Sequence, residues 1–324
     1  MNSKIALIYI GGTFGCIGEP LAPMPDTLFF PQLKNILPPQ FQIEYFSASN
    51  IKDSSACTAV DWLRLIQQIQ NLQLKEFQHF IVIHGTDTMS YAAATLAHFL
   101  QNSARIIITG SQYPLLNIAG NTLREFSDAY TNLITSLENI QKVEAGVYLS
   151  FHDQIFHART AIKMHSTELN AFSGQLLHEP LNQSFQEQWL VDEHHIKQIE
   201  SLNIFNISLR PVEIPQFNQN LKLLTTQPPD ILIIQAYGTG NLAVNQDSLE
   251  LFKKLQQQQC RIILDSQVPF GQLDQRYAIS SWLSNSGILI NDTLSDADLY
   301  AKILKMYLQY PSADQWHLHW YDYS

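Results

Sequence analysis

The stretch Phe80–Leu100, FIVIHGTDTMSYAAATLAHFL, decides the fold. Its first residues, Phe80–Ile83, are aromatic or aliphatic and predict a buried strand. A polar loop, His84–Met89, follows, and the apolar residues after it recur at the spacing of a helix over Ser90–Leu100. A strand, a short loop and a helix begin a βαβ unit, and repeated βαβ units form a parallel sheet.

The same alternation continues in both directions along the chain. Further strands are predicted at Ile5–Ile10, Phe41–Phe46, Arg105–Thr109, Gly146–Phe151, Ile231–Ala236, Arg261–Leu264 and Gly287–Ile290. Further helices are predicted at Ala59–Leu72, Thr122–Leu137, Ser248–Gln257 and Asp296–Leu308. We therefore expect an α/β fold, in which a larger N-terminal, mostly parallel sheet is flanked by helices and a smaller α/β domain follows.

Two stretches interrupt this alternation. The proline-rich segment between Pro20 and Pro39 is predicted to be irregular. From Pro180 to Pro229 the sequence is rich in Gln, Asn and Glu and shows no clear period. We expect a catalytic α/β domain over residues 1–190, an irregular connector over 191–228 and a C-terminal α/β domain over 229–324.

Composition excludes several classes of protein. With a net charge of −10 the chain is a poor match to nucleic acid, which requires a basic face. The three cysteines, Cys16, Cys57 and Cys260, show no metal-binding or redox spacing, so we expect no metal. The first apolar run is too short for a signal-peptide core and no run is long enough to span a membrane, so we expect a cytoplasmic protein.

Because ligands of open α/β sheets bind outside the carboxyl ends of the strands, the loops there carry the functional prediction. Gly11–Gly15 follows the first strand and holds Thr13, a hydroxyl beside backbone N–H groups that suits a nucleophile. A plain turn is an equal alternative for this loop alone, whereas the nucleotide-binding glycine spacing is absent. Thr86 and Asp87 precede a helix, where they could serve as N-caps or receive a substrate ammonium group.

Two other loops contribute hydroxyl groups. Asp53, Ser54 and Ser55 follow the second predicted strand and suit an amino-acid head group, although a simple turn is the alternative. Thr109–Gln112 ends another strand with small polar residues. Each loop alone is a weak signal. Together they predict hydroxyl-nucleophile chemistry on a small polar substrate, without a cofactor.

At this point the sequence resembles a known family, the bacterial L-asparaginases. HGTDTM at residues 84–89, between a strand and a helix, is the specific match, and IGGTFG at residues 10–15 resembles the first active-site signature. Other similar segments are DSSACT (53–58), TGSQ (109–112), ARTAIKMHSTELNAF (158–172) and IQAYGTGN (234–241). Without a signal peptide, the chain looks like the cytoplasmic type I branch.

The resemblance implies an activity and its residues. The activity is hydrolysis of L-asparagine to L-aspartate and ammonia through an acyl-enzyme on a threonine, with minor glutaminase activity and no cofactor. The implied catalytic residues are Thr13, the nucleophile, and Thr86, Asp87 and Lys163. The implied substrate-binding residues are Asp53, Ser54, Ser55, Thr86 and Asp87, with Ser111 near the leaving amide. Family members assemble as homodimers or homotetramers.

The chain also departs from the family pattern. Gly18–Pro23 lacks the usual lid tyrosine, and Ile162 stands where threonine is usual. Ile118–Gly120 and Ser266–Val268 differ from the usual S-D-G and TQC-like segments. These departures motivate an alternative, a non-catalytic amino-acid-binding or sensor protein of the same family. A third hypothesis, an amidotransferase component acting on charged tRNA, predicts a basic face, which the composition does not offer.

Overall fold

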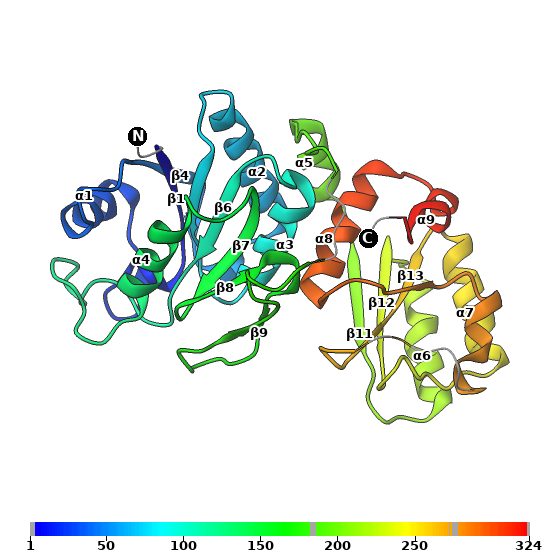
Figure 1. Ribbon diagram of the computed structural model, residues 1–324. Helices are drawn as coiled ribbons and strands as arrows, with labels where there is room; N and C mark the ends of the chain where they lie inside the picture. Colours follow the sequence, from blue (N-terminus) through cyan, green and yellow to red (C-terminus); the bar gives the residue numbers. More distant parts are fainter. Residues whose placement is uncertain (1–3, 182–185, 272, 274–277, 323–324) are drawn as a thin grey trace. The chain divides into compact units, whose positions relative to one another are not determined.

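The computed structural model describes residues 4–181, 186–271, 273 and 278–322 (Figure 1). The chain forms two compact units. The first contains Met1–Glu200 and Tyr300–Leu304, and the second contains Ser201–Leu299 and Lys305–Ser324. Each unit is built on a mostly or wholly parallel sheet with flanking helices, which confirms the predicted α/β fold class.

The first unit holds a six-stranded sheet in the order β4-β1-β5-β6-β7-β8. All neighbours are parallel except β7 and β8, which are antiparallel. The strands are β1 (Ile5–Gly11), β4 (Ile43–Lys52), β5 (His79–Ile83), β6 (Arg105–Thr109), β7 (Gly146–Phe151) and β8 (Gln154–His157). Ile83 pairs with both Tyr9 and Thr109, so the carboxyl ends of β1, β5 and β6 are level and their loops leave the sheet together.

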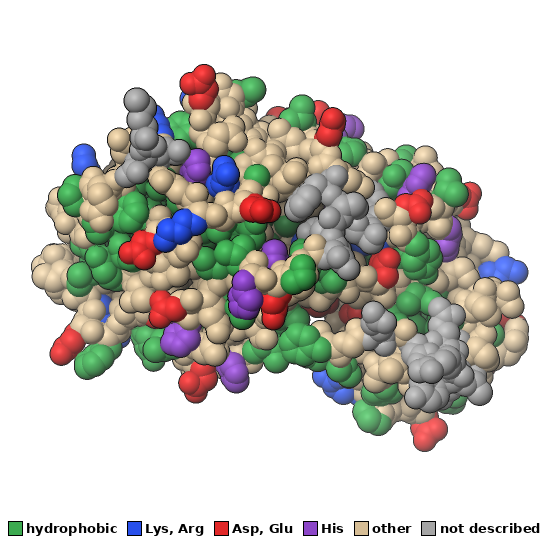
Figure 2. Space-filling model, in the orientation of Figure 1, with side chains coloured by type: hydrophobic (Ala, Val, Ile, Leu, Met, Phe, Trp, Pro, Cys, Tyr) green, Lys and Arg blue, Asp and Glu red, His purple; other side chains and the backbone are tan. Residues whose placement is uncertain are grey.

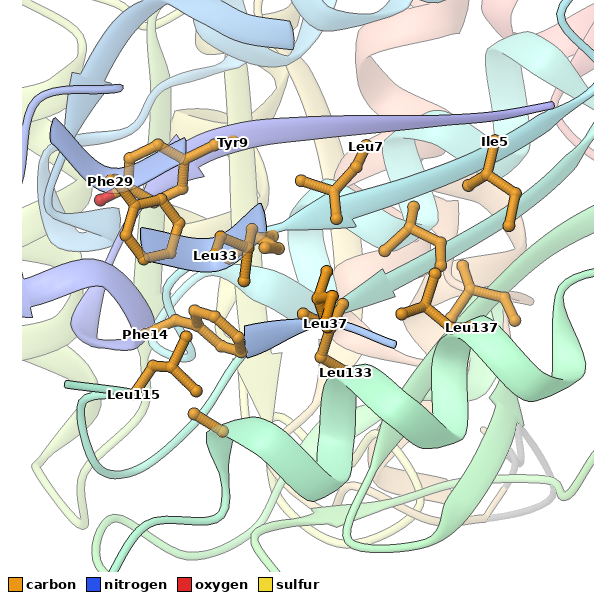
Figure 3. Packing of buried hydrophobic residues seen from close by; sticks show 14 of the residues in the cluster. Ile5, Leu7, Tyr9, Phe14, Phe29, Leu33, Leu37, Leu115, Leu133 and Leu137 are labelled. Atoms are coloured by element: carbon orange, nitrogen blue, oxygen red, sulfur yellow. The ribbon is translucent and has the colours of Figure 1, made fainter. Parts of the chain in front are cut away.

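Helices cover this sheet because its strands are apolar on both faces. Helix α1 (Asp26–Ile36) and helix α4 (Ala129–Asn139) enclose one cluster of buried side chains with β1, β5 and β6. Figure 3 shows its members packed together: Ile5, Leu7, Tyr9, Phe14, Phe29, Leu33, Leu37, Leu115, Leu133 and Leu137. Helix α2 (Ala59–Gln73) packs against β4 and helix α3 (Met89–Leu100) against β7. The alternate β1 residues are buried as well, as strands covered on both faces require.

Three predictions about regular structure are wrong. The proline-rich segment contains α1, in which Phe29 and Leu33 lie one turn apart and are buried while Pro31 is exposed. The helix predicted from Thr122 begins at Ala129, because the backbone of residues 122–124 pairs with that of residues 115–117 instead of forming helical hydrogen bonds. The stretch 191–228 is no irregular connector, since α5 (Glu193–Glu200), β11 (Ile204–Ser208) and α6 (Ile214–Leu224) lie in it.

The second unit holds a parallel sheet in the order β11-β12-β13-β14. Its later strands are β12 (Ile231–Ala236), β13 (Arg261–Ser266) and β14 (Leu289–Ile290). Helices α6 and α7 (Gln246–Gln257) pack on one face around Phe217, Leu221, Phe252 and Leu255. The chain ends with α8 (Asp296–Gln309) and α9 (Ala313–His319).

Two small antiparallel ladders complete the first unit: β2 (Cys16–Ile17) with β3 (Ala22–Pro23), and β9 (Ile162–Lys163) with β10 (Phe172–Ser173). None of the helices in the described ranges has both the length and the apolar character needed to cross a bilayer. On the face shown in Figure 2, Lys and Arg side chains are scattered singly among acidic and uncharged ones.

Candidate active site

The loops at the carboxyl edge of the first sheet are in main-chain contact. A Cβ atom placed on Gly12 would overlap Gly85 Cα, and one placed on Gly110 would overlap the carbonyl oxygen of His84. A Cβ atom on Gly85 would lie 2.5 Å from the Oγ of Ser54. Because only glycine leaves room for such approaches, these positions bring the loops after β1, β4, β5 and β6 together.

The predicted lysine meets the predicted threonine and aspartate at this edge. Lys163 Nζ donates hydrogen bonds to Thr86 Oγ1 at 2.9 Å and to Asp87 Oδ1 at 2.8 Å. Lys163 comes from the small β9–β10 ladder, outside the main sheet, and its side chain is 19% exposed while that of Asp87 is 59% exposed. One ammonium group therefore joins the Thr86 hydroxyl and the Asp87 carboxylate.

The loop after β4 is joined to the same turn. The Asp53 carboxylate caps the short 3₁₀ helix Ser54–Ala56, accepting from Ser55 N at 2.8 Å and from Ser55 Oγ at 2.6 Å. Ser54 Oγ accepts from Asp87 N at 3.3 Å, and Thr88 Oγ1 donates to the Ser54 carbonyl at 2.8 Å. Ser54 therefore connects this loop to the turn, and Asp53 and Ser55 are held together beside it.

Thr13 begins a 3₁₀ turn, Thr13–Gly15, directly after β1. The next residue, Phe14, is fully buried in the core and anchors the turn, while Thr13 itself is half-buried. Gly12 touches Gly85, and these two glycines immediately precede Thr13 and Thr86, so the two threonines lie on adjoining segments of chain. Among the described residues, no hydrogen bond uses the Thr13 hydroxyl.

The loop after β6 is fixed from two sides. Ser111 is buried and its hydroxyl donates to the Tyr113 carbonyl at 2.6 Å. The Asp128 carboxylate accepts from the backbone N–H groups of Gln112 and Tyr113. Gln112 Nε2 donates to the Glu168 carbonyl at 2.9 Å, which ties this loop to the segment that follows Lys163. The sequence did not single out Asp128 or Gln112 as positioning residues.

Cysteines near this edge are not activated. Burial, and then the charge of Asp53, raises the pKa of Cys16 to about 11, and burial raises that of Cys57 to about 11 as well. Both thiols therefore stay protonated at neutral pH, where the thiolate is the reactive form. The Cys16 thiol instead donates to the Gly12 carbonyl at 3.2 Å. Threonine hydroxyls are thus the better candidates for a nucleophile.

One residue missed by sequence reasoning is His84. Its imidazole is fully buried and contacts both the Trp62 indole and the Gly85 carbonyl. Burial lowers the pKa of His84 to about 4. No local pattern signals this contact, because Trp62 is 22 residues away and reads as one more apolar position of α2.

The structure thus brings Thr86, Asp87, Lys163 and Ser54 into direct contact and places the Thr13 turn against them. Asp53 and Ser55 lie one residue on either side of Ser54. Within residues 4–181 and the later described ranges, no three His, Cys, Asp or Glu residues are grouped to hold a metal ion.

Comparison with known proteins assigns the family. Residues 4–196 match the family model described as Asparaginase, N-terminal. The chain belongs to the asparaginase family. The match confirms the resemblance seen in the sequence and indicates amidohydrolase chemistry on an amino-acid substrate.

The similarity of this asparaginase-family chain to known proteins covers most of its length. It is 24% identical to L-asparaginase 1 of Escherichia coli strain K12 over 312 residues, which covers 89% of this chain and 87% of that protein. It is 25% identical to a component of the glutamyl-tRNA(Gln) amidotransferase of Sulfolobus acidocaldarius, covering 92% and 70%. The crystal structure of a probable cytoplasmic L-asparaginase from Campylobacter jejuni superposes with a TM-score of 0.74 at 19% identity, covering 97% and 98%.

Proposed function

We propose that this chain is an L-asparaginase, which hydrolyses the side-chain amide of L-asparagine to L-aspartate and ammonia. The observation that carries the proposal is the pair of hydrogen bonds from Lys163 Nζ to Thr86 and Asp87, beside the Gly12–Gly85 contact. This arrangement supplies two hydroxyl groups, one cation and one carboxylate at a single strand edge. Those are the groups that an acyl transfer through threonine needs.

In the proposed first half-reaction, Thr13 Oγ attacks the carbonyl carbon of the substrate amide. The hydroxyl proton passes to the leaving nitrogen through the Thr86–Lys163 hydrogen bond, the C–N bond breaks and ammonia departs. The ester left on Thr13 is the acyl-enzyme. In the second half-reaction, water attacks this ester, aspartate leaves, and the Thr13 hydroxyl regains its proton.

The proposed binding roles follow from charge and exposure. The exposed Asp87 carboxylate, which also accepts a hydrogen bond from Lys163, receives the substrate ammonium group. Ser54, Ser55 and the backbone of their 3₁₀ turn hold the substrate carboxylate, and Asp53 orients Ser55 for this task. Ser111 belongs to the loop nearest the leaving amide. L-glutamine, one methylene longer, is expected to react more slowly by about 10- to 200-fold.

Ammonia release from L-asparagine and L-glutamine tests the proposal. Wild type should release ammonia from L-asparagine, and Thr13→Ala and Thr86→Ala should not. Thr13→Ser keeps the hydroxyl and should retain part of the activity, whereas Thr131→Ala, an exposed threonine on α4, should match wild type. Hydroxylamine added during turnover should trap the acyl group as aspartyl hydroxamate.

Other outcomes favour other functions. If the folded wild type releases no ammonia but L-aspartate or L-asparagine raises its melting temperature, the chain is an amino-acid-binding or sensor protein. Ammonia transfer that requires charged tRNA would instead match the relative from Sulfolobus acidocaldarius, which is named as part of an amidotransferase.

We further propose a cytoplasmic location, homodimeric or homotetrameric assembly and a catalytic role for the first unit. The location is supported by the likeness to a probable cytoplasmic asparaginase. The catalytic role is supported by the position of Thr13, Thr86, Asp87 and Lys163 within Met1–Glu200. Fractionation of the source cells, and light scattering of the purified protein, test the location and the assembly.

A further inference from the structure

His84 follows β5 and uses both ring nitrogens. Trp62 Nε1 donates to His84 Nε2 at 3.2 Å, and His84 Nδ1 lies 2.8 Å from the Gly85 carbonyl oxygen. An indole nitrogen can only donate, so His84 Nε2 is the acceptor and the ring proton is on Nδ1. The Nδ1–H group therefore donates to the Gly85 carbonyl.

The backbone of His84 is as constrained as its ring. Its N–H donates to the Thr109 carbonyl at 2.8 Å, and Gly110 packs against its carbonyl oxygen. The imidazole has no exposed surface, and burial keeps it neutral at physiological pH by lowering its pKa to about 4. A neutral ring has one donor and one acceptor, which matches the two partners present.

The contact with Gly85 fixes the next peptide plane. In a trans peptide the C=O and the following N–H point in opposite directions, so the N–H of Thr86 points away from His84. In the described ranges this N–H donates to no other group, and Thr86 follows the glycine that touches Gly12. A preorganised N–H beside a reacting carbonyl stabilises the negative charge that develops on its oxygen.

We propose that His84, held in one tautomer by Trp62, is a positioning residue that sets the Gly85–Thr86 peptide for catalysis. The proposal rests on the proposed amidohydrolase function. It explains why a residue beside the reactive turn is histidine although it contacts no substrate. Loss of the indole N–H leaves the ring free to change tautomer, and the Nδ1–H donor to Gly85 is then only partly populated.

Trp62→Phe is the principal test, since it removes the N–H group and keeps an aromatic ring facing Tyr91. We expect kcat for L-asparagine to fall about 10-fold while KM changes less than about twofold, because the loss is in transition-state stabilisation. Phe252→Leu, in the core of the second unit, is the matched control for lost packing. It should lower the urea midpoint of unfolding without lowering kcat.

Two substitutions of His84 itself provide a second test. His84→Asn keeps an N–H donor near the position of Nδ1 and should retain more of kcat than His84→Leu, which keeps none. Long-range ¹H–¹⁵N NMR of wild type, assigned by the loss of signals in His84→Asn, should show protonated Nδ1 and unprotonated Nε2. In Trp62→Phe the two tautomers should be mixed.

A wild type protonated on Nε2 overturns the proposal, as does a Trp62→Phe variant with unchanged kcat. If Trp62→Phe does not fold, equal kcat values for His84→Asn and His84→Leu overturn it instead. A wild type that hydrolyses no amide refutes the amidohydrolase function itself and, with it, this role. The wild-type assay alone identifies that case, so the two failures are distinguishable.

Discussion

Glycine-containing loops follow the strands of both sheets, but the glycines differ in how closely neighbouring main chain approaches them. At the carboxyl edge of the first sheet, Gly12 and Gly110 touch other segments of main chain that a Cβ atom would overlap. In the second unit, Gly238 follows β12, and a Cβ atom there would meet only the Asn241 amide nitrogen at 3.9 Å. Glycine therefore permits a close main-chain approach at Gly12 and Gly110, whereas at Gly238 it supplies only a positive φ.

The carboxylates at the two edges also differ, in their exposure and in their partners. The Asp87 carboxylate is largely exposed and paired with Lys163. Asp265, at the end of β13, is buried, accepts a hydrogen bond from Asn291 Nδ2 at 2.7 Å, and has a pKa raised by burial. The first edge leaves its carboxylate accessible to solvent, whereas the second satisfies its carboxylate internally. Topology alone therefore does not distinguish the two edges.

Removing the Lys163 charge should give the largest effect. Lys163→Met keeps the length of the side chain but leaves Thr86 and Asp87 without their shared donor. We expect kcat/KM for L-asparagine to fall about 10³-fold, the scale of a lost acid–base partner. Steady-state ammonia release measures this. Asp265→Asn, the counterpart at the second edge, should leave kcat/KM unchanged, and a Lys163→Met variant within tenfold of wild type would contradict the contrast.

Breaking the main-chain contact should have the next largest effect. In Gly12→Ala the new methyl group overlaps Gly85, so one of the two loops must move. A displacement of about 1 Å at reacting groups can cost about 100-fold in rate, and overpacking costs about 2 kcal/mol in stability. Ammonia release and urea unfolding report the two effects. Normal activity in a folded Gly12→Ala protein would show that the contact is dispensable.

Lowering the pH should destabilise the folded protein through the buried His84 at the first edge. The pKa of His84 is about 4 in the folded protein against 6.5 for the free side chain, because burial outweighs the opposing effects of the Gly85 carbonyl, Asp61 and Asp53. The unfolded chain therefore binds more protons between these values. The stability contributed by neutral His84 is present above pH 6.5 and is lost as the pH falls towards 4, by about 3 kcal/mol.

Urea unfolding of wild type and His84→Asn across this pH range measures that contribution. The difference in unfolding free energy between the two proteins should shrink as the pH falls. A difference that stays constant from pH 6.5 to pH 4 would mean that the imidazole titrates normally in the folded protein.

The smallest effect is expected at the open glycine of the second edge. Gly238 has φ of 51°, which alanine can adopt at a cost of about 1 kcal/mol, and no main-chain atom is in the way of the new methyl group. Gly238→Ala should therefore lower the unfolding free energy by about that amount, less than Gly12→Ala. A larger loss than in Gly12→Ala would reverse the comparison between the edges.

Most of the regular structure could be predicted from the sequence because its signals are local. The strands Arg105–Thr109, Gly146–Phe151 and Ile231–Ala236 were predicted with the bounds that they have. The helix before β4 was missed because Pro31 has no N–H group to donate and its ring clashes with the preceding turn, which argues against a helix interior. The strand Ile204–Ser208 was missed because several of its side chains are exposed, as on an edge strand.

Residues of the candidate site that belong to one loop could be predicted from the sequence. Contacts between different loops could not. Thr13, Thr86 and Asp87 stand out because they follow strands, but Lys163 was placed only by resemblance to a family. Its contact with Asp87 joins residues 76 positions apart. The contact between Trp62 and His84, like the one between Gly12 and Gly85, depends on tertiary packing, which no periodic pattern encodes.

The glycine contacts at the first edge also limit how this protein can be redesigned. Where main chain rests on main chain, no side chain is available to enlarge or trim, so Gly12, Gly85 and Gly110 offer no way to reshape the candidate site. Variant libraries aimed at a different amide should leave these three positions fixed. They should instead sample the exposed Ser55 and the tip of the hairpin between β2 and β3, whose changes do not have to be absorbed by a neighbouring backbone.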